Sequence, residues 1–315
     1  MKLMQIAAWA VLALAASPAM GSDVIRLIIP TAPGGGTDGF FRIAAKQAQP
    51  YLDARLVIFN IPGAGGTKGV TELVNSKPDA PTIAGVWNSP ITVSPQTMKV
   101  PYTLNDYVPV MQLTSAPYVM CVHPQFPAHD GASFIQELKN SPDKYTYGND
   151  GAGGSGQLAT ERIFRKLGAR ARPVPYKGAG DILLGFLSSS VDIYVGSIMP
   201  ILPYTKNGKA KCLLLTSAKR TPMLPSASSL QDLGIPGEET LLWRALIAPK
   251  NMPKEQLAKI ADAFEKAANS PVIRKFEHDA GEEVLIRKGA ALRSMIDNEY
   301  KAFGAVAKSL NLRPQ

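Results

Sequence analysis

The sequence predicts an α/β fold built from mostly parallel sheets. Short apolar runs typical of strands alternate with segments of helical periodicity, and glycine-rich turns follow three of these runs. Such alternation builds βαβ units, in which helices cover a parallel sheet. The chain has 315 residues, which is long for one core and suits two domains. We therefore expect two lobes, each with helices flanking its own sheet.

The apolar runs are expected as strands at 24–30, 55–60, 82–87, 118–124, 145–149, 172–176, 191–196, 211–216 and 243–249. Helical patterns occupy 37–52, 156–168, 181–189, 254–269 and 291–310. The last two helices follow no further run of alternating elements, so we expect them to pack back on the first lobe. This order predicts crossings near Thr114 and Thr216, with lobe 1 formed by 22–113 plus 217–315 and lobe 2 by 114–216.

Residues 1–21 are predicted to be a cleaved signal peptide. Lys2 precedes an apolar run from Ile6 to Ala16, and small residues suited to a signal peptidase follow. The run is shorter than the roughly 20 residues of a membrane-spanning helix. An uncleaved membrane anchor is the alternative. Cleavage would leave a mature protein in the periplasm.

The charge of the chain favours anionic solutes over nucleic acid. The net charge is +9, but basic residues are dispersed and form no stripe with interleaved aromatic residues.

The two cysteines are far apart in the sequence. Cys121 and Cys212 each lie in a strand-like run without a cysteine nearby. Export would permit a disulfide, but two separately buried thiols are the favoured interpretation, and the spacing predicts no metal site.

Three glycine-rich turns indicate an anion site: "PGGGTDG" (33–39), "PGAGGTKG" (62–69) and "GNDGAGGSGQ" (148–157). Glycine lets backbone N–H groups approach a bound anion, and ligands of open α/β sheets lie at the carboxyl ends of strands. Turns from two lobes could therefore close on one small anion. Tight connections without a ligand are the alternative for any single turn.

Nucleotide binding and catalysis are not predicted. Two turns match G-x-G-x-x-G, but the strands that follow end in Asn60 and in Tyr176-Lys177, without the acidic residue that holds a ribose. Ser155 lacks the final glycine of a nucleophile elbow, and the three histidines have no evident catalytic partner. We expect no enzyme activity, no cofactor and no metal.

The sequence resembles the solute receptors of the tripartite tricarboxylate transporters, the TctC or Bug family. The resemblance extends over residues 24–310 and is carried by these stretches, in family order: "IRLIIPTAPGGGTD", "PGAGGTKG", "VPYTLNDYVPV", "PYKGAGD", "VDIYVGSIMPILPYTKNGKAKCLLLTSAKRTPMLPSASSLQDLG" and "IAPKNMP". It implies a two-lobed type II periplasmic binding protein fold that closes on a small carboxylate. It also implies a monomer that delivers this ligand to a membrane permease with a large and a small subunit.

By position, the resemblance implies that backbone groups of both lobes bind the ligand. In lobe 1 these are Gly34, Gly35, Gly36, Thr37, Gly63, Ala64, Gly65 and Gly66, with Trp87 and Asn88 on the next strand end. In lobe 2 they are Asn149, Gly151, Ala152, Gly154, Ser155, Gly178, Ala179, Gly180 and Gly196. Asp38 is interpreted instead as a cap or ion partner of the following helix, since its carboxylate would repel an anion.

Three departures from the family pattern concern the ligand. Gly196 stands where many members have an aspartate, so a contact to an amino group is missing and amino acids are disfavoured. Arg244 stands in an apolar strand and should have an anionic partner, either a protein carboxylate or the second carboxylate of a diacid. Trp87 replaces a small hydroxylated residue and could stack on an aromatic acid.

The predicted function is that of a receptor for a di- or tricarboxylate, aliphatic or aromatic, that works by closure of two lobes. A ligand-sensing adaptor for a membrane signalling protein is the alternative, and an α/β-hydrolase-type enzyme ranks third. Neighbouring genes would separate transport from sensing.

Overall fold

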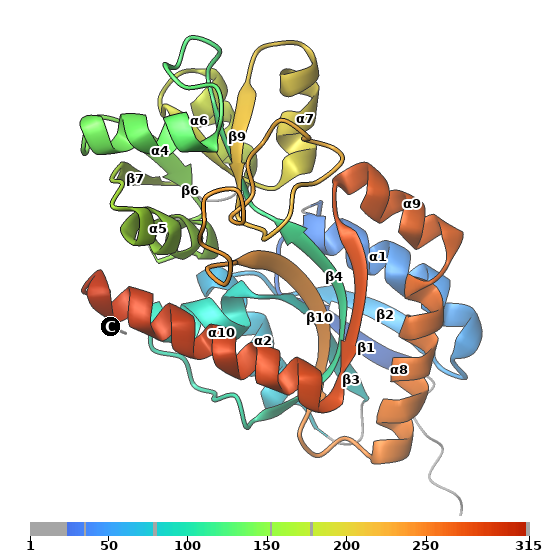
Figure 1. The fold of residues 1–315 in the computed structure, drawn as a ribbon. Coiled ribbons are helices and arrows are strands. Elements are labelled where there is room, and N and C mark those ends of the chain that lie inside the picture. Colours follow the sequence, from blue (N-terminus) through green and yellow to red (C-terminus); the bar gives the residue numbers. More distant parts are fainter. Residues whose placement is uncertain (1–23, 35, 78–80, 152, 177–178, 313–315) are drawn as a thin grey trace, which may run out of the picture.

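A computed structural model describes residues 24–312 except 35, 78–80, 152 and 177–178. The predicted signal peptide lies outside the described residues. Two sheets, each covered by helices on both faces, form an upper and a lower lobe in Figure 1. The prediction of a two-lobed α/β protein is confirmed.

The lower sheet has the strand order β11-β4-β10-β3-β1-β2. Its strands are β1 (Val24–Ile29), β2 (Arg55–Asn60), β3 (Thr82–Trp87), β4 (Tyr107–Pro117), β10 (Leu241–Pro249) and β11 (Glu283–Lys288). The helices that accompany it are α1 (Gly36–Ala48), η1 (Gln49–Tyr51), η2 (Ala64–Gly66), α2 (Thr67–Val74), η3 (Ser89–Val93), α3 (Ser94–Thr97), α8 (Lys254–Ala268), α9 (Pro271–Ala280) and α10 (Gly289–Ser309).

Alternating side chains bury both faces of this sheet. On β1, Leu27 and Ile29 pack with Phe41 of α1 and Phe264 of α8, whereas Ile28 packs with α2 and α10. Figure 1 shows α1, α8 and α9 on one face and α2 and α10 on the other. The predicted return of the two C-terminal helices to the first lobe therefore matches their packing in the structure.

The upper sheet has the strand order β7-β6-β8-β5-β9. Its strands are β5 (Val119–Val122), β6 (Thr146–Asn149), β7 (Arg172–Pro175), β8 (Ile193–Gly196) and β9 (Lys211–Leu215). Its helices are α4 (Gly131–Asn140), α5 (Ser155–Leu167), α6 (Ala179–Leu187) and α7 (Ile198–Lys206). Core clusters place α4 and α5 on one face and α6 and α7 on the other.

The sheets are mixed, so the prediction of mostly parallel sheets is wrong in this detail. Parallel pairing joins β2, β1 and β3 in the lower sheet and β7, β6 and β8 in the upper one. Beside each parallel set the pairing is antiparallel, through β10, β4 and β11 below and through β5 and β9 above. The reversed strands are β10 and β11 in the lower sheet and β5 in the upper sheet. The chain enters the upper sheet from the lower lobe through β5 and returns to the lower sheet through β10, so both strands run opposite to those whose carboxyl ends face the other lobe.

Two segments carry the chain between the sheets, at Tyr118 and before Leu241. Thr216 ties them together: the Tyr118 N–H donates to its hydroxyl at 2.9 Å, and that hydroxyl donates to the carbonyl of Thr240. Leu224 and Leu230 pack in the cores of the upper lobe. The lobe boundaries remain a prediction, and this packing favours a second crossing near Thr240 over one near Thr216.

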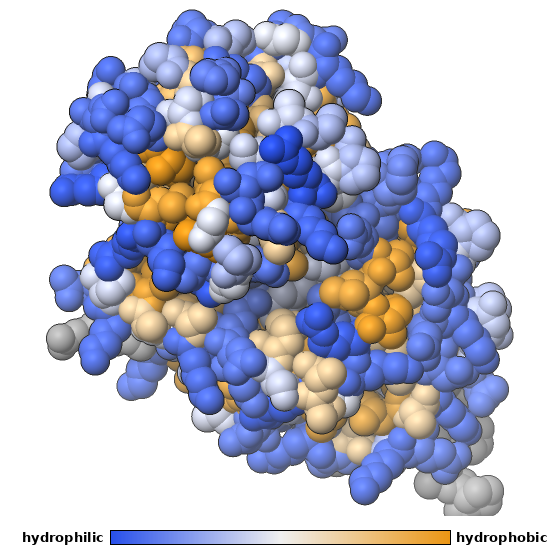
Figure 2. Space-filling model, in the orientation of Figure 1, coloured by the Kyte–Doolittle hydropathy of each residue, from blue (hydrophilic) through white to orange (hydrophobic). Residues whose placement is uncertain are grey.

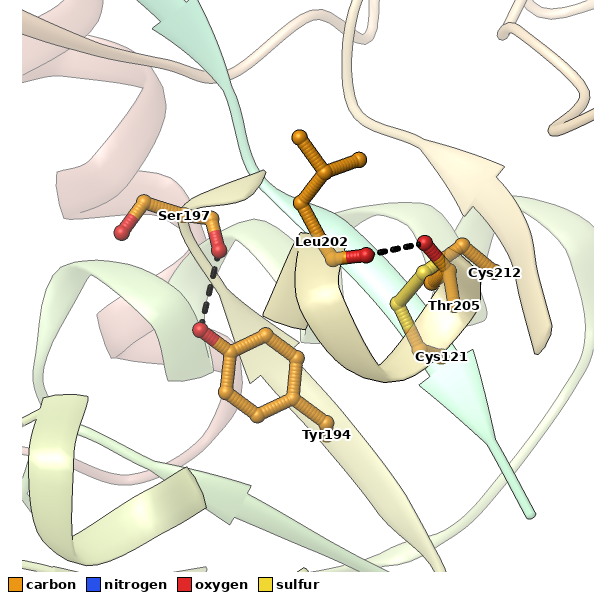
Figure 3. Close-up of a disulfide and its surroundings, with 6 residues drawn as sticks. All are labelled: Cys121, Tyr194, Ser197, Leu202, Thr205 and Cys212. Atoms are coloured by element: carbon orange, nitrogen blue, oxygen red, sulfur yellow. Dashed lines mark hydrogen bonds between the residues drawn. A yellow bond between two sulfur atoms is a disulfide. The ribbon is translucent and has the colours of Figure 1, made fainter. Parts of the chain in front are cut away.

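Cys121 and Cys212 form a disulfide, so the prediction of two free thiols is wrong (Figure 3). They are opposite each other on the antiparallel strands β5 and β9, with Cα atoms 3.8 Å apart. They are 91 residues apart in the chain, and only the strand order brings them together.

Hydrophilic side chains cover most of both lobes on the face in Figure 2. Of the helices in the described part of the chain, none has the length and apolar character needed to cross a membrane.

Candidate functional site

The carboxyl ends of strands from both sheets face one cavity of about 660 Å³ between the lobes. The predicted site residues that line it are Gly36, Thr37, Gly63, Ala64, Gly65, Gly66, Trp87, Ser155, Gly180, Gly196 and Arg244. The structure thus brings together residues from three glycine turns, from the strands β3, β8 and β10, and from the start of α6. The arrangement follows from topology, since the turns after β1, β2 and β6 leave their sheets at the ends that face each other.

The first glycine turn leads into α1. Gly34 has a φ of +87°, and its N–H donates to the Asp38 carboxylate at 2.9 Å. Asp38 also accepts bonds of 2.8 Å from Arg42 and Asn60. Burial raises its pKa, but these hydrogen bonds outweigh that effect and lower it overall. Asp38 is therefore a structural ion partner, as predicted, and the first turn of α1 is left facing the cavity.

The second turn has left-handed backbone geometry at four successive residues. The φ angles are +125° at Gly63, +47° at Ala64, +62° at Gly65 and +91° at Gly66. A side chain at Gly66 would lie 2.7 Å from the ring of Trp87, so glycine is required there. The indole of Trp87 consequently lies against this turn and in the cavity wall.

The third turn joins β6 to α5 and contains a residue that the sequence interpretation missed. Asp150 lines the cavity, where its Oδ1 accepts the Gly156 N–H and its Oδ2 accepts the Ser155 hydroxyl, both at 2.9 Å. Tyr118, also missed, donates to the Ser155 Oγ at 2.8 Å. Asp150 stands inside "GNDGAGGSGQ", but the resemblance implied contacts only from Asn149, Gly151, Ala152, Gly154 and Ser155 of that turn.

The other predicted residues lie behind the cavity wall or outside the described residues. Gly34, Gly151 and Gly154 belong to the turns but do not line the cavity, and Ala179 is the first residue of α6. Asn88 is buried and donates to the Leu241 carbonyl at 3.2 Å. Asn149 is fully buried, and its side chain has no hydrogen-bond partner among the described residues. The remaining predictions, Gly35, Ala152 and Gly178, fall outside the described residues.

Arg244 has a protein carboxylate as its anionic partner. Its guanidinium pairs with Glu282, and both side chains are about 5% exposed. The same guanidinium donates to Thr37 at 3.4 Å and lies 3.2 Å from where a Gly36 side chain would begin. Arg244 thus places N–H donors beneath the first turn of α1, while Glu282 balances its charge.

Gly196 lines the cavity, and the side chain of Tyr194 occupies the space beside it. The Tyr194 hydroxyl donates to the Ser197 carbonyl at 2.9 Å (Figure 3). A side chain at Gly196 would collide with the Tyr194 ring and hydroxyl. Among the residues that the structure describes, no three His, Cys, Asp or Glu side chains are grouped so that they could hold a metal.

Two α/β lobes that are linked by paired crossing segments and enclose a cavity at the carboxyl ends of their strands have the architecture of a periplasmic solute-binding protein. The family model of TctC, the tripartite tricarboxylate transporter family receptor, matches residues 40–312, and the chain belongs to this family. This confirms the predicted family, whose members are solute receptors and not enzymes.

Similar proteins agree in length and fold. A UPF0065 protein of Bordetella pertussis is 29% identical, over 93% of this chain and 91% of its own. The structure of the periplasmic binding protein BugD is 26% identical, with a TM-score of 0.79 over 93% of this chain and 99% of that one. MatC of Rhodopseudomonas palustris, solved with bound malate, shares the fold at 24% identity, with a TM-score of 0.77 over 90% of this chain and 98% of that one.

Proposed function

We propose that this protein is exported with loss of residues 1–21, binds a small di- or tricarboxylate between its lobes as a periplasmic monomer, and delivers it to a tripartite-tricarboxylate-type permease with a large and a small subunit. The observation that carries the proposal is the convergence of the first turn of α1, the left-handed turn at Gly63–66 and Arg244 on one cavity. Helix N-termini and turns of this kind bind carboxylates because their N–H groups lack partners. The family supports the carboxylate and the permease.

Closure of the lobes would couple binding to transport. The ligand would dock on α1 and the Gly63–66 turn, and the turns after β6 and β8 would complete its environment, so that it stabilises the closed state. Tyr118, Thr216 and Thr240 are the natural hinge, because they join the two crossing segments by hydrogen bonds.

Gly180 offers a steric test of this site. It lines the cavity near the start of α6, and a side chain there would meet nothing within 4 Å in the present structure. Gly180→Leu should therefore fill space that the ligand needs without a collision inside the protein. Gly39 also has open space and lies in the first turns of α1, but it does not line the cavity, so Gly39→Leu is the matched control.

The experiment is calorimetry of wild type and both variants against malate, succinate, citrate and a benzene dicarboxylate. The proposal predicts that at least one acid binds wild type and Gly39→Leu similarly, and Gly180→Leu at least tenfold more weakly. Equal binding to all three proteins would place the site elsewhere. Failure of every acid to bind wild type would contradict the proposed function.

A further inference from the structure

Asp150 presents a carboxylate to the same cavity that is proposed to hold a carboxylate ligand. Its side chain is exposed to the cavity, between the end of β6 and the start of α5. The bond from the Gly156 N–H to Oδ1 and the bond from Ser155 to Oδ2 hold it in place. Tyr118 in turn donates to Ser155, so the orientation is set from the hinge side as well.

The carboxylate retains capacity for further hydrogen bonds. An ionised carboxylate offers about four acceptor positions, and the two bonds from Ser155 and Gly156 use two of them. No Lys, Arg or His of the described chain forms an ion pair with Asp150. Burial raises the pKa of Asp150, although the Ser155 hydroxyl and the backbone N–H groups of Gly156, Asp150 and Ser155 act in the opposite direction. A further donor would therefore be favourable here, whereas a second carboxylate would be repelled.

The opposite wall has the complementary character. There the first turn of α1 and the Gly63–66 turn supply N–H donors and the partial positive charge of a helix N-terminus. Arg244 adds further N–H donors, although Glu282 balances its charge. Asp150 itself occupies the N-terminus of α5, through its bond to Gly156, so this helix end is less available to a ligand anion than that of α1. The lower lobe therefore presents hydrogen-bond donors to the cavity, whereas the upper lobe presents a carboxylate.

We infer that the ligand is a carboxylic acid that also carries a hydrogen-bond donor, a hydroxyl or an ammonium group, with its carboxylate against α1 and its donor on Asp150. This inference rests on the proposed function and narrows its substrate class. It also reverses one expectation from the sequence. Gly196 lacks the acidic side chain that would receive an amino group, but Asp150 supplies a carboxylate to the same cavity from another turn.

The test compares acids that differ in one group: succinate, L-malate and L-aspartate, and glutarate, 2-hydroxyglutarate and L-glutamate. Calorimetry is done on the full chain as wild type and as Asp150→Asn, which retains an acceptor oxygen for Gly156 and removes the charge. Glu161→Gln is the matched control, because Glu161 lies on α5 beside Tyr147 and does not line the cavity. Thermal unfolding of each variant verifies folding.

The inference predicts opposite effects of Asp150→Asn on the two kinds of acid. The Kd of the donor-bearing acids should rise about tenfold, as expected for loss of a charge-assisted bond, and the Kd of the plain diacids should fall about threefold with the repulsion removed. The hydroxy and amino acids show which donor is used. If Asp150→Asn changes the Kd of donor-bearing acids and of plain diacids in the same direction, or changes neither, the inference is overturned, while carboxylate binding itself still stands. Absence of binding by every acid, in wild type and variants, would contradict the proposed function itself.

Discussion

The guanidinium of Arg244 and the carboxylate of Glu282 form an ion pair that is almost fully buried beneath the interlobe cavity. Arg244 lies on β10, and Glu282 lies in the short segment between α9 and β11. The ion pair therefore holds the end of α9 against β10. Glu277 of α9 lies in the same cluster and is 1% exposed. Two carboxyl groups therefore share one cation inside the lower lobe.

Arg244→Met should destabilise the protein by about 3 kcal/mol or more, because it leaves the carboxylate of Glu282 buried without a cation. Glu265→Gln is the control, since it breaks the exposed pair with Lys288 and should cost less than about 1 kcal/mol. Urea unfolding measures both changes. A small effect of Arg244→Met would show that water or a rearrangement of the protein stabilises the carboxylate of Glu282 without a cation.

The same variant tests whether Arg244 also contacts the ligand. If it binds the second carboxylate of a diacid, Arg244→Met should weaken a diacid on the order of tenfold more than its monoacid analogue. Calorimetry with such a pair gives the two ratios. Equal losses for both acids would indicate that Arg244 acts through the ion pair alone.

Glu277 should make the protein less stable as the pH rises. Burial, and then the neighbouring Glu282, raise the pKa of Glu277 to about 9 from 4.5. The folded state therefore binds more protons than the unfolded state between about pH 4.5 and 9, so its stability falls as pH rises through this window. Glu277→Gln removes this titration. The urea midpoint of the variant should exceed that of wild type by an amount that grows from pH 5 to pH 9, and parallel pH profiles would contradict this.

Trp87 should report ligand binding by fluorescence. It lines the cavity, whereas Trp243 is 2% exposed and donates to Glu299 at 2.8 Å. Trp243→Phe should keep a ligand-induced change in emission, and Trp87→Phe should lose most of it. A change that survives in Trp87→Phe would assign the signal to movement at Trp243.

Trp87 also tests aromatic preference. If the indole stacks on the ligand, a benzene dicarboxylate should bind more tightly than an aliphatic diacid of similar length by about 0.5–1.5 kcal/mol, and Trp87→Leu should remove the difference. A preference that is absent or unchanged in the variant would leave Trp87 as a wall residue only.

The disulfide should stabilise the upper lobe. Cys121→Ala with Cys212→Ala should lower stability by about 2–4 kcal/mol, because the bridge closes a long loop. A reductant should lower the melting temperature of wild type and have no effect on the double variant. Thiol titration of denatured, unreduced wild type should detect no free thiol; two thiols would contradict the bridge.

The parts of the fold that could be predicted are those with local signals. Strand runs followed by glycine turns and periodic helices identified β1, β2, α1, α5, α8 and α10, since each depends on its own side-chain pattern. The long strand β4 was missed because Pro109, Gln112 and Thr114 interrupt its apolar pattern, and both faces are nevertheless buried by neighbours from distant segments. Strand direction and the Cys121–Cys212 bridge depend on strand order, which no local pattern specifies.

In the candidate site, too, some residues have a local sequence signal and others depend on the fold. The glycine turns were found because left-handed backbone geometry requires glycine at Gly65 and Gly66. The Arg244 partner could be predicted only as a carboxylate, because Glu282 reaches it through the packing of α9. Asp150 was missed because a carboxylate in an anion-binding turn makes sense only when the opposite wall of the cavity is known.

The central claim is that a small carboxylate binds between the lobes. The most direct measurement is mass spectrometry of the small molecules released from wild type and from Gly180→Leu after gentle purification from the periplasm. The account predicts a carboxylic acid in near-stoichiometric amount in wild type and strongly depleted in Gly180→Leu. A released ligand without a carboxylate, or equal amounts of the acid from both proteins, would contradict it.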